Sequence, residues 1–131
     1  MFKYTVAVHG FTAQAANLIS EPVAVGDYQD STVDDAQNPS QVIVYSTGPA
    51  AGLRIAQRHL THVHARLAYT NPSAIGRTAD DIVYGEARAR AETLTPGQRE
   101  EESHYAMHSE SDALRMDALV DVMHERGEID R

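Results

Sequence analysis

Two segments of alternating or continuous apolar residues predict the main β-strands of the chain. Residues 2–9 alternate between apolar and polar side chains, which is typical of a strand with one buried face. Gly10 follows and predicts the end of that strand. Residues 41–46 form a short run of β-branched and aromatic side chains, QVIVYS, which predicts a second strand.

The segments between these strands are less regular. We interpret residues 12–20 as a short helix, although their pattern is also compatible with a strand. Residues 22–26 predict a short strand at a sheet edge, because Pro22 cannot donate a backbone hydrogen bond. Residues 27–40 are rich in Asp, Ser, Gln, Asn and Pro, so we expect a long polar loop.

Helical periodicity dominates the rest of the chain. The first helix is predicted over residues 49–69, starting at Pro49, and a second over 79–92, starting at a capping box. A third and long helix is predicted over residues 96–126, also starting at a capping box. In the first helix, apolar side chains recur every three or four residues and predict one buried stripe: Leu53, Ala56, Leu60, Val63 and Leu67.

Strands first and helices afterwards indicate a single α+β domain over residues 1–131. We expect a small, mostly antiparallel sheet from the N-terminal third, followed by three helices of which the last is long. The apolar stripe of the long helix is narrow, and such helices often pair with a second copy, so we expect a homo-oligomer.

Composition narrows the class of protein. The chain has no cysteine, which excludes disulfides and thiolate metal sites. No N-terminal signal or membrane-spanning segment is visible, so we expect a soluble, cytoplasmic protein without a membrane partner. The formal net charge is −8, which argues against general attraction to nucleic acid.

That average charge hides a segregation. Residues 36–79 contain neither Asp nor Glu, so this window carries +4 and the remainder carries −12. Its positive charges are all arginines: Arg54, Arg58, Arg66 and Arg77. The acid-free segment is therefore the surface on which we expect a function.

Helical phase places most of this charge on one ridge of the predicted helix 49–69. Four side chains recur every fourth residue, so that each is displaced about 40° around the axis from the previous one. They are Arg54, Arg58, His62 and Arg66, and His59 lies beside them. The helix opens at Ser46, Thr47 and Gly48, where backbone N–H groups and the helix dipole favour an anion.

The ridge and the turn together predict a site for a phosphate-bearing small molecule or a nucleic-acid backbone. The turn matches neither a Walker motif nor a dinucleotide fingerprint. The alternative is a ridge that is only solvated, or that pairs with the acidic C-terminal helix of the same chain.

A second constellation lies in the predicted long helix. Glu101, His104, His108 and Asp112 are spaced to share one helix face, so a divalent metal at Glu101, His104 and His108 is conceivable. No hydrolytic or di-iron signature accompanies these residues. The carboxylates also suit the helix dipole without any metal.

The preferred interpretation is a small non-enzymatic binding protein without a resident cofactor, which holds its ligand on the basic helix face. One alternative is a viral or mobile-element accessory or inhibitor protein that binds a protein partner through its acidic C-terminal helix. A further alternative is a metal-dependent hydrolase.

Overall fold

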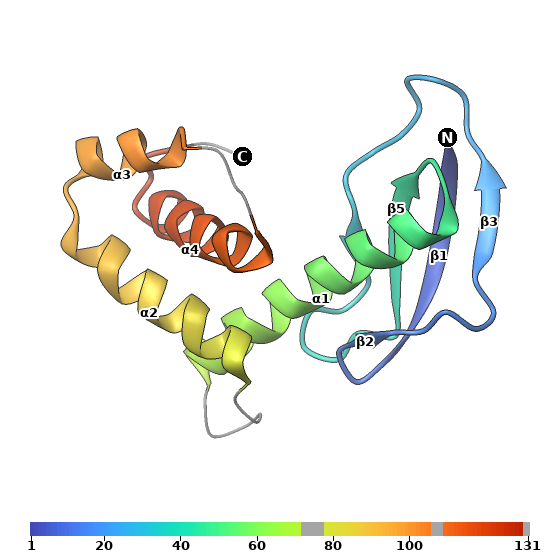
Figure 1. Ribbon diagram of the computed structural model, residues 1–131, viewed down its shortest axis with the longest axis horizontal. Coiled ribbons are helices and arrows are strands. Elements are labelled where there is room, and N and C mark those ends of the chain that lie inside the picture. Colours follow the sequence, from blue (N-terminus) through green and yellow to red (C-terminus); the bar gives the residue numbers. More distant parts are fainter. Residues whose placement is uncertain (72–77, 106–108, 130–131) are drawn as a thin grey trace. The chain divides into compact units, whose positions relative to one another are not determined.

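The computed structural model describes residues 1–71, 78–105 and 109–129. The chain forms two compact units, Met1–His64 and Ala65–Arg131, and helix α1 (Pro49–Thr70) belongs in part to each (Figure 1). Within the described ranges, a five-stranded antiparallel sheet is followed by four helices, which confirms the α+β class. The prediction of one domain remains a prediction.

The sheet of the first unit is built around β1 (Phe2–His9) and β5 (Gln41–Ser46), which pair antiparallel with Tyr4 opposite Val44. Both strands lie where the sequence pattern predicts them. Three short strands complete the sheet. β2 (Thr12–Ala13) and β3 (Ile19–Pro22) pair with the other edge of β1, and β4 (Thr32–Val33) pairs with β5.

Helix α1 covers one face of this sheet, as its predicted apolar stripe requires (Figure 1). The buried side chains that join helix and sheet are Tyr4, Val6, Val42, Val44, Ala56 and Leu60. Gly52 is the closest approach, because a Cβ atom there would lie 3.0 Å from Cδ2 of Tyr4 and 3.4 Å from Cγ2 of Val44. The missing side chain therefore lets the helix approach the sheet.

The expected helix over 12–20 is wrong. Its alanines have helical propensity, but the open edge of β1 offers backbone hydrogen bonds that β2 takes instead. The Nε2 and Oε1 atoms of Gln57 on α1 hold this segment by bonds to the carbonyl of Phe11 (3.1 Å) and the N–H of Ala13 (2.9 Å). Asn17 has a φ of 58°, which interrupts any helix there.

The structure also differs from the sequence prediction over residues 19–40. The strand expected at 22–26 occurs earlier, at Ile19–Pro22, and ends at the proline. The polar loop 27–40 contains β4 and a turn that Asp34 closes. One oxygen of this carboxylate accepts hydrogen bonds from the backbone N–H groups of Ser40 (3.0 Å) and Gln41 (3.1 Å).

The second unit contains α2 (Ala79–Thr93), α3 (Pro96–Ser103) and α4 (Glu110–Glu125). The predicted helix 79–92 and both predicted capping boxes are confirmed. The backbone N–H of Thr78 donates to Asp81 at 2.8 Å, and that of Thr95 donates to Gln98 at 2.9 Å. In each case the threonine hydroxyl accepts the reciprocal bond.

The single long helix expected over 96–126 is wrong, because α3 ends at Ser103 and α4 starts after Ser109. The end of α3 is rich in Glu and Ser and supplies little apolar surface to extend the helix. The Ser109 hydroxyl then accepts a bond from the N–H of Asp112 at 3.2 Å and caps α4. The homo-oligomer prediction depends on a long projecting helix, so it loses its main support and remains a prediction.

Candidate functional site

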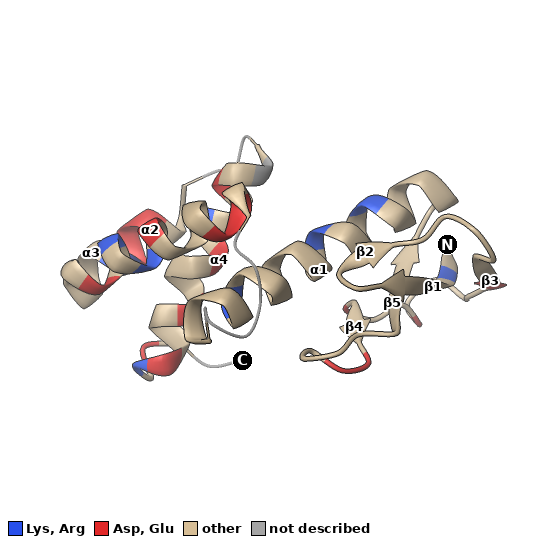
Figure 2. Ribbon diagram, turned by 90° about the horizontal axis from the view of Figure 1, so that it is seen from below, with Lys and Arg blue, Asp and Glu red and all other residues tan. Residues whose placement is uncertain are grey.

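The acid-free segment folds mainly into α1, and two of its arginines stand out by exposure. Arg54 and Arg58 are exposed on the first unit, whereas His59 and His62 are half-buried. Neither Arg54 nor Arg58 makes a hydrogen bond or ion pair within residues 1–71, 78–105 and 109–129. Figure 2 shows α1 with basic bands and no acidic ones.

Arg66, the last member of the predicted ridge, has a different environment in the second unit. Its guanidinium donates two hydrogen bonds to the buried carboxylate of Asp121 on α4, from Nη2 to Oδ1 at 2.7 Å and from Nε to Oδ2 at 3.2 Å. The hydroxyl of buried Tyr84 donates to the same carboxylate at 2.5 Å. Burial and this bond raise the pKa of Tyr84 to about 12. The alternative in which the acidic C-terminal helix neutralises the ridge therefore applies to Arg66.

Most arginines of the second unit are likewise engaged with carboxylates of that unit. Arg88 pairs with Glu125 at 2.5 Å and lies over the ring of Tyr69, with 4.6 Å from its Cζ to the ring centroid. The other pairs, by their shortest N–O distances, are Arg90–Glu102 (2.5 Å), Arg99–Glu128 (2.6 Å) and Arg115–Asp112 (3.2 Å). This unit therefore uses arginine mainly to join its own helices.

Burial distinguishes Arg99 from the other arginines. Its side chain is 2% exposed, and it donates both to Glu128 and to the carbonyl oxygens of Ala91 and Leu94 at the end of α2. These bonds connect α2, α3 and the C-terminal end of the chain. Arg99 is accordingly a structural residue.

The acidic C-terminal helix is also partly consumed by these pairs. Asp121 is 5% exposed and bound by Arg66, and Glu125 is bound by Arg88, whose guanidinium lowers the pKa of that carboxyl. With Asp112, which pairs with Arg115, three carboxylates of α4 are thus engaged inside the unit. An interaction with a basic protein partner through this helix remains a prediction.

The turn that opens α1 offers backbone groups more than side chains. Ser46 is 5% exposed, and its hydroxyl donates to the carbonyl of Gly48 at 3.2 Å. Thr47 is exposed and Gly48 is half-buried. The first turn of α1 contains no acidic residue that would compete with an anion. A ligand at this turn would therefore meet Thr47 and the helix dipole, while Ser46 fixes the turn.

The metal site conceived at Glu101, His104 and His108 loses its geometric argument, because Glu101 lies on α3 and His104 is the residue that caps its end. His108 lies outside the described residues. Among those that the structure does describe, no group of three or more His, Asp or Glu side chains could hold a metal ion. Glu101 and Asp112 lie on different helices, so the single helix face that suggested this set of ligands is not formed by these two residues.

A second candidate site, which the sequence analysis did not predict, is a pocket of about 410 Å³ in the second unit. It is lined by α2, α3 and α4 together with Tyr105. Val83, Ala87 and Ala91 recur every fourth residue along α2 and contribute its apolar wall. That spacing was a detectable signal, but it is also typical of an ordinary buried helix face.

Comparisons of the chain with protein-family models, with curated proteins and with solved structures found no match. No described helix is long and apolar enough to cross a bilayer. Any functional assignment therefore depends on the side chains of this molecule.

Proposed function

We propose that the first unit is a non-enzymatic binding module for phosphate-bearing ligands, either a small molecule or a nucleic-acid backbone. Arg54 and Arg58 are its principal contacts, with Thr47 and Gly48 at the helix opening as secondary ones. The observation that carries the proposal is that these two guanidiniums are exposed and have no carboxylate partner in the described parts of the chain.

Helix geometry brings these groups within reach of one ligand. Arg54 lies about 9 Å along the axis from Gly48, at 1.5 Å per residue, and helical side chains lean toward the N-terminus. Arg58 follows one turn later on nearly the same face. Guanidiniums bind phosphate through two parallel hydrogen bonds, so two of them can hold one phosphate or two adjacent phosphates.

Energetics also favour a ligand at this position. Like charges four residues apart destabilise a helix by about 0.2–0.5 kcal/mol when nothing compensates them. Elsewhere in the molecule, Arg66, Arg88, Arg90, Arg99 and Arg115 all have carboxylate partners. An anion supplied by a ligand would provide the missing compensation for Arg54 and Arg58.

The test uses a fluorescein-labelled single-stranded oligonucleotide and, separately, pyrophosphate, each titrated at about 50 and about 200 mM salt. The native chain should bind the oligonucleotide more weakly at the higher salt. The double variant R54Q/R58Q should lose most of this affinity. The magnitude of its slope of log K against log salt should fall by about 1.4, since each lost phosphate contact on a single strand removes about 0.7.

The double variant R115Q/R126Q is the matched control, because it makes the same change in net charge on the second unit. It should bind as the native chain does. Replacing Arg54 and Arg58 removes a helix repulsion, so loss of binding would not arise from unfolding. The proposal is wrong if the native chain binds neither probe, or if both double variants weaken binding equally. Binding of pyrophosphate but not of the oligonucleotide would assign the site to small phosphorylated molecules.

A further inference from the structure

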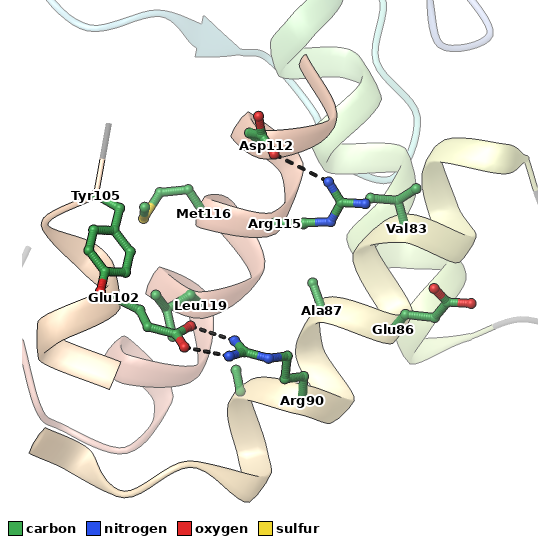
Figure 3. Close-up of a pocket in the computed structure, with 11 residues that line it drawn as sticks. Val83, Glu86, Ala87, Arg90, Glu102, Tyr105, Asp112, Arg115, Met116 and Leu119 are labelled. Carbon is green, nitrogen blue, oxygen red and sulfur yellow. Dashed lines mark hydrogen bonds and ion pairs between the residues drawn. The ribbon is translucent and has the colours of Figure 1, made fainter. Parts of the chain in front are cut away.

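The pocket of the second unit combines an apolar interior with a charged rim (Figure 3). Val83 and Ala87 of α2 face Met116 and Leu119 of α4 across it, and Ala91 of α2 also lines it. The ring of Tyr105, which is 64% exposed, lies beside Met116. A volume of about 410 Å³ lies in the range of pockets that bind small molecules.

The two arginines that line the pocket, Arg90 and Arg115, each form an ion pair with a carboxylate at the rim. Arg90 holds Glu102 through two hydrogen bonds of 2.5 Å each, so its charge is neutralised within the pocket wall. The pKa of Glu102 is lowered by this contact. Arg115 donates to Asp112 at 3.2 Å. Both guanidiniums that line the pocket are therefore already paired with carboxylates.

Glu86 leaves the rim with an excess of negative charge. Its side chain is exposed, its carboxylate is directed outward from the mouth, and it makes no hydrogen bond or ion pair within the described ranges (Figure 3). The second unit as a whole contains 14 carboxylates and 8 arginines, a formal charge of −6. Such a field attracts cations and repels anions.

We infer that this pocket binds a small amphipathic cation, an apolar chain or ring that carries an ammonium or guanidinium group. The apolar part would lie between Ala87 and Met116, where its burial contributes about 0.8 kcal/mol per methylene group. The cationic group would remain at the mouth on the side of Glu86, whose carboxylate attracts it. This site uses a different unit and the opposite ligand charge from the phosphate site.

Three probes separate the parts of this inference. The full chain, labelled with ¹³C at its methionine methyl groups, is titrated with n-octylammonium below its micelle-forming concentration. Octanoate provides the same chain with the opposite charge, and methylammonium provides the charge without the chain. The Met116 methyl resonance should shift saturably with octylammonium. Octanoate and methylammonium should bind at least about tenfold more weakly.

Two pairs of variants locate the binding. A87L fills the pocket and should weaken octylammonium binding at least about tenfold, whereas A89L makes the same change at an exposed position of α2 outside this pocket and should not. E86Q removes the charge at the mouth and should weaken binding about two- to fivefold. E100Q removes an exposed carboxylate that does not line the pocket and should leave affinity unchanged.

The inference is overturned if octylammonium causes no saturable shift, or if octanoate binds as tightly as octylammonium. It is also overturned if A87L binds octylammonium with native affinity. Should A87L fail to fold, the E86Q and E100Q pair decides, because these exposed substitutions do not disturb the core. Equal affinity of those two variants then refutes the cation site.

Discussion

Replacement of Tyr84 by Phe tests whether the buried contact between α2 and α4 stabilises the second unit. Tyr84 is 0% exposed and donates to Asp121 at 2.5 Å. A hydrogen bond to a charged acceptor contributes about 1.5–3 kcal/mol. Asp121 keeps its two bonds from Arg66, so the carboxylate is not orphaned. We therefore expect a loss near the lower limit, about 1.5–2 kcal/mol.

Two other tyrosines provide controls for the same chemical change. Tyr69 is 37% exposed and its hydroxyl donates to Glu92 at 3.1 Å, where water can replace the bond. Y69F should cost about 0.5 kcal/mol. Tyr105 is 64% exposed and its hydroxyl has no hydrogen-bond partner among the described residues, so Y105F should change stability by less than about 0.5 kcal/mol.

The assay is urea unfolding followed by far-ultraviolet circular dichroism at pH 8, which does not depend on the tyrosine chromophore. Because the folded-state pKa of Tyr84 is raised from 10.0 to about 12, its contribution is complete below pH 10 and decreases as the pH rises toward 12. The native chain should therefore lose stability relative to Y84F over that interval. A loss in Y84F no larger than that in Y105F would refute this reasoning.

Two further predictions concern two helical glycines, Gly52 and Gly85, and the carboxylate of Asp34. G85A should raise the free energy of unfolding by about 0.5–1 kcal/mol, because alanine favours a helix more than glycine does. In G52A the new Cβ atom would lie 3.0 Å from Tyr4, and this contact should cancel or reverse the gain. Thermal unfolding midpoints that rise equally in both variants would contradict the packing argument. The hydrogen bonds to Asp34 lower its pKa from 3.8 to about 2, so its contribution to folding is present above pH 3.8 and is lost as the pH falls toward 2. Between pH 5 and pH 2, the urea midpoint of D34N should therefore depend less on pH than that of the native chain. D27N is the control and should behave as the native chain does, because its exposed carboxylate has no hydrogen bond within the described residues. Equal pH dependence in the two variants would contradict the assignment.

The elements that the sequence predicted correctly are those whose signals lie in neighbouring residues. The strands at 2–9 and 41–46 and the two capping boxes depend on neighbouring residues, so the sequence alone was sufficient. The structure of segment 12–20 was predicted wrongly, because its pairing with β1 is a long-range interaction that overrides local propensity. The break between α3 and α4 was missed for a related reason. Spacing can suggest one continuous helix, but a weakly apolar stretch and a good capping residue, Ser109, divide it.

At the candidate site, too, local spacing could be predicted from the sequence, whereas contacts between distant residues could not. Helical phase assigns Arg54, Arg58 and Arg66 to one ridge and gives no reason to treat them differently. Their partners do differ: Arg66 binds a buried carboxylate 55 residues away in sequence, a contact that periodicity cannot predict. The acid-free window therefore contains at least two kinds of arginine, one that joins helices and a pair that remains exposed. Among the described arginines of this window, only Arg54 and Arg58 lack a carboxylate partner, so only their charge is left for a ligand to neutralise. R54Q/R58Q, and not a variant that includes Arg66, therefore tests binding without also testing the stability of the second unit.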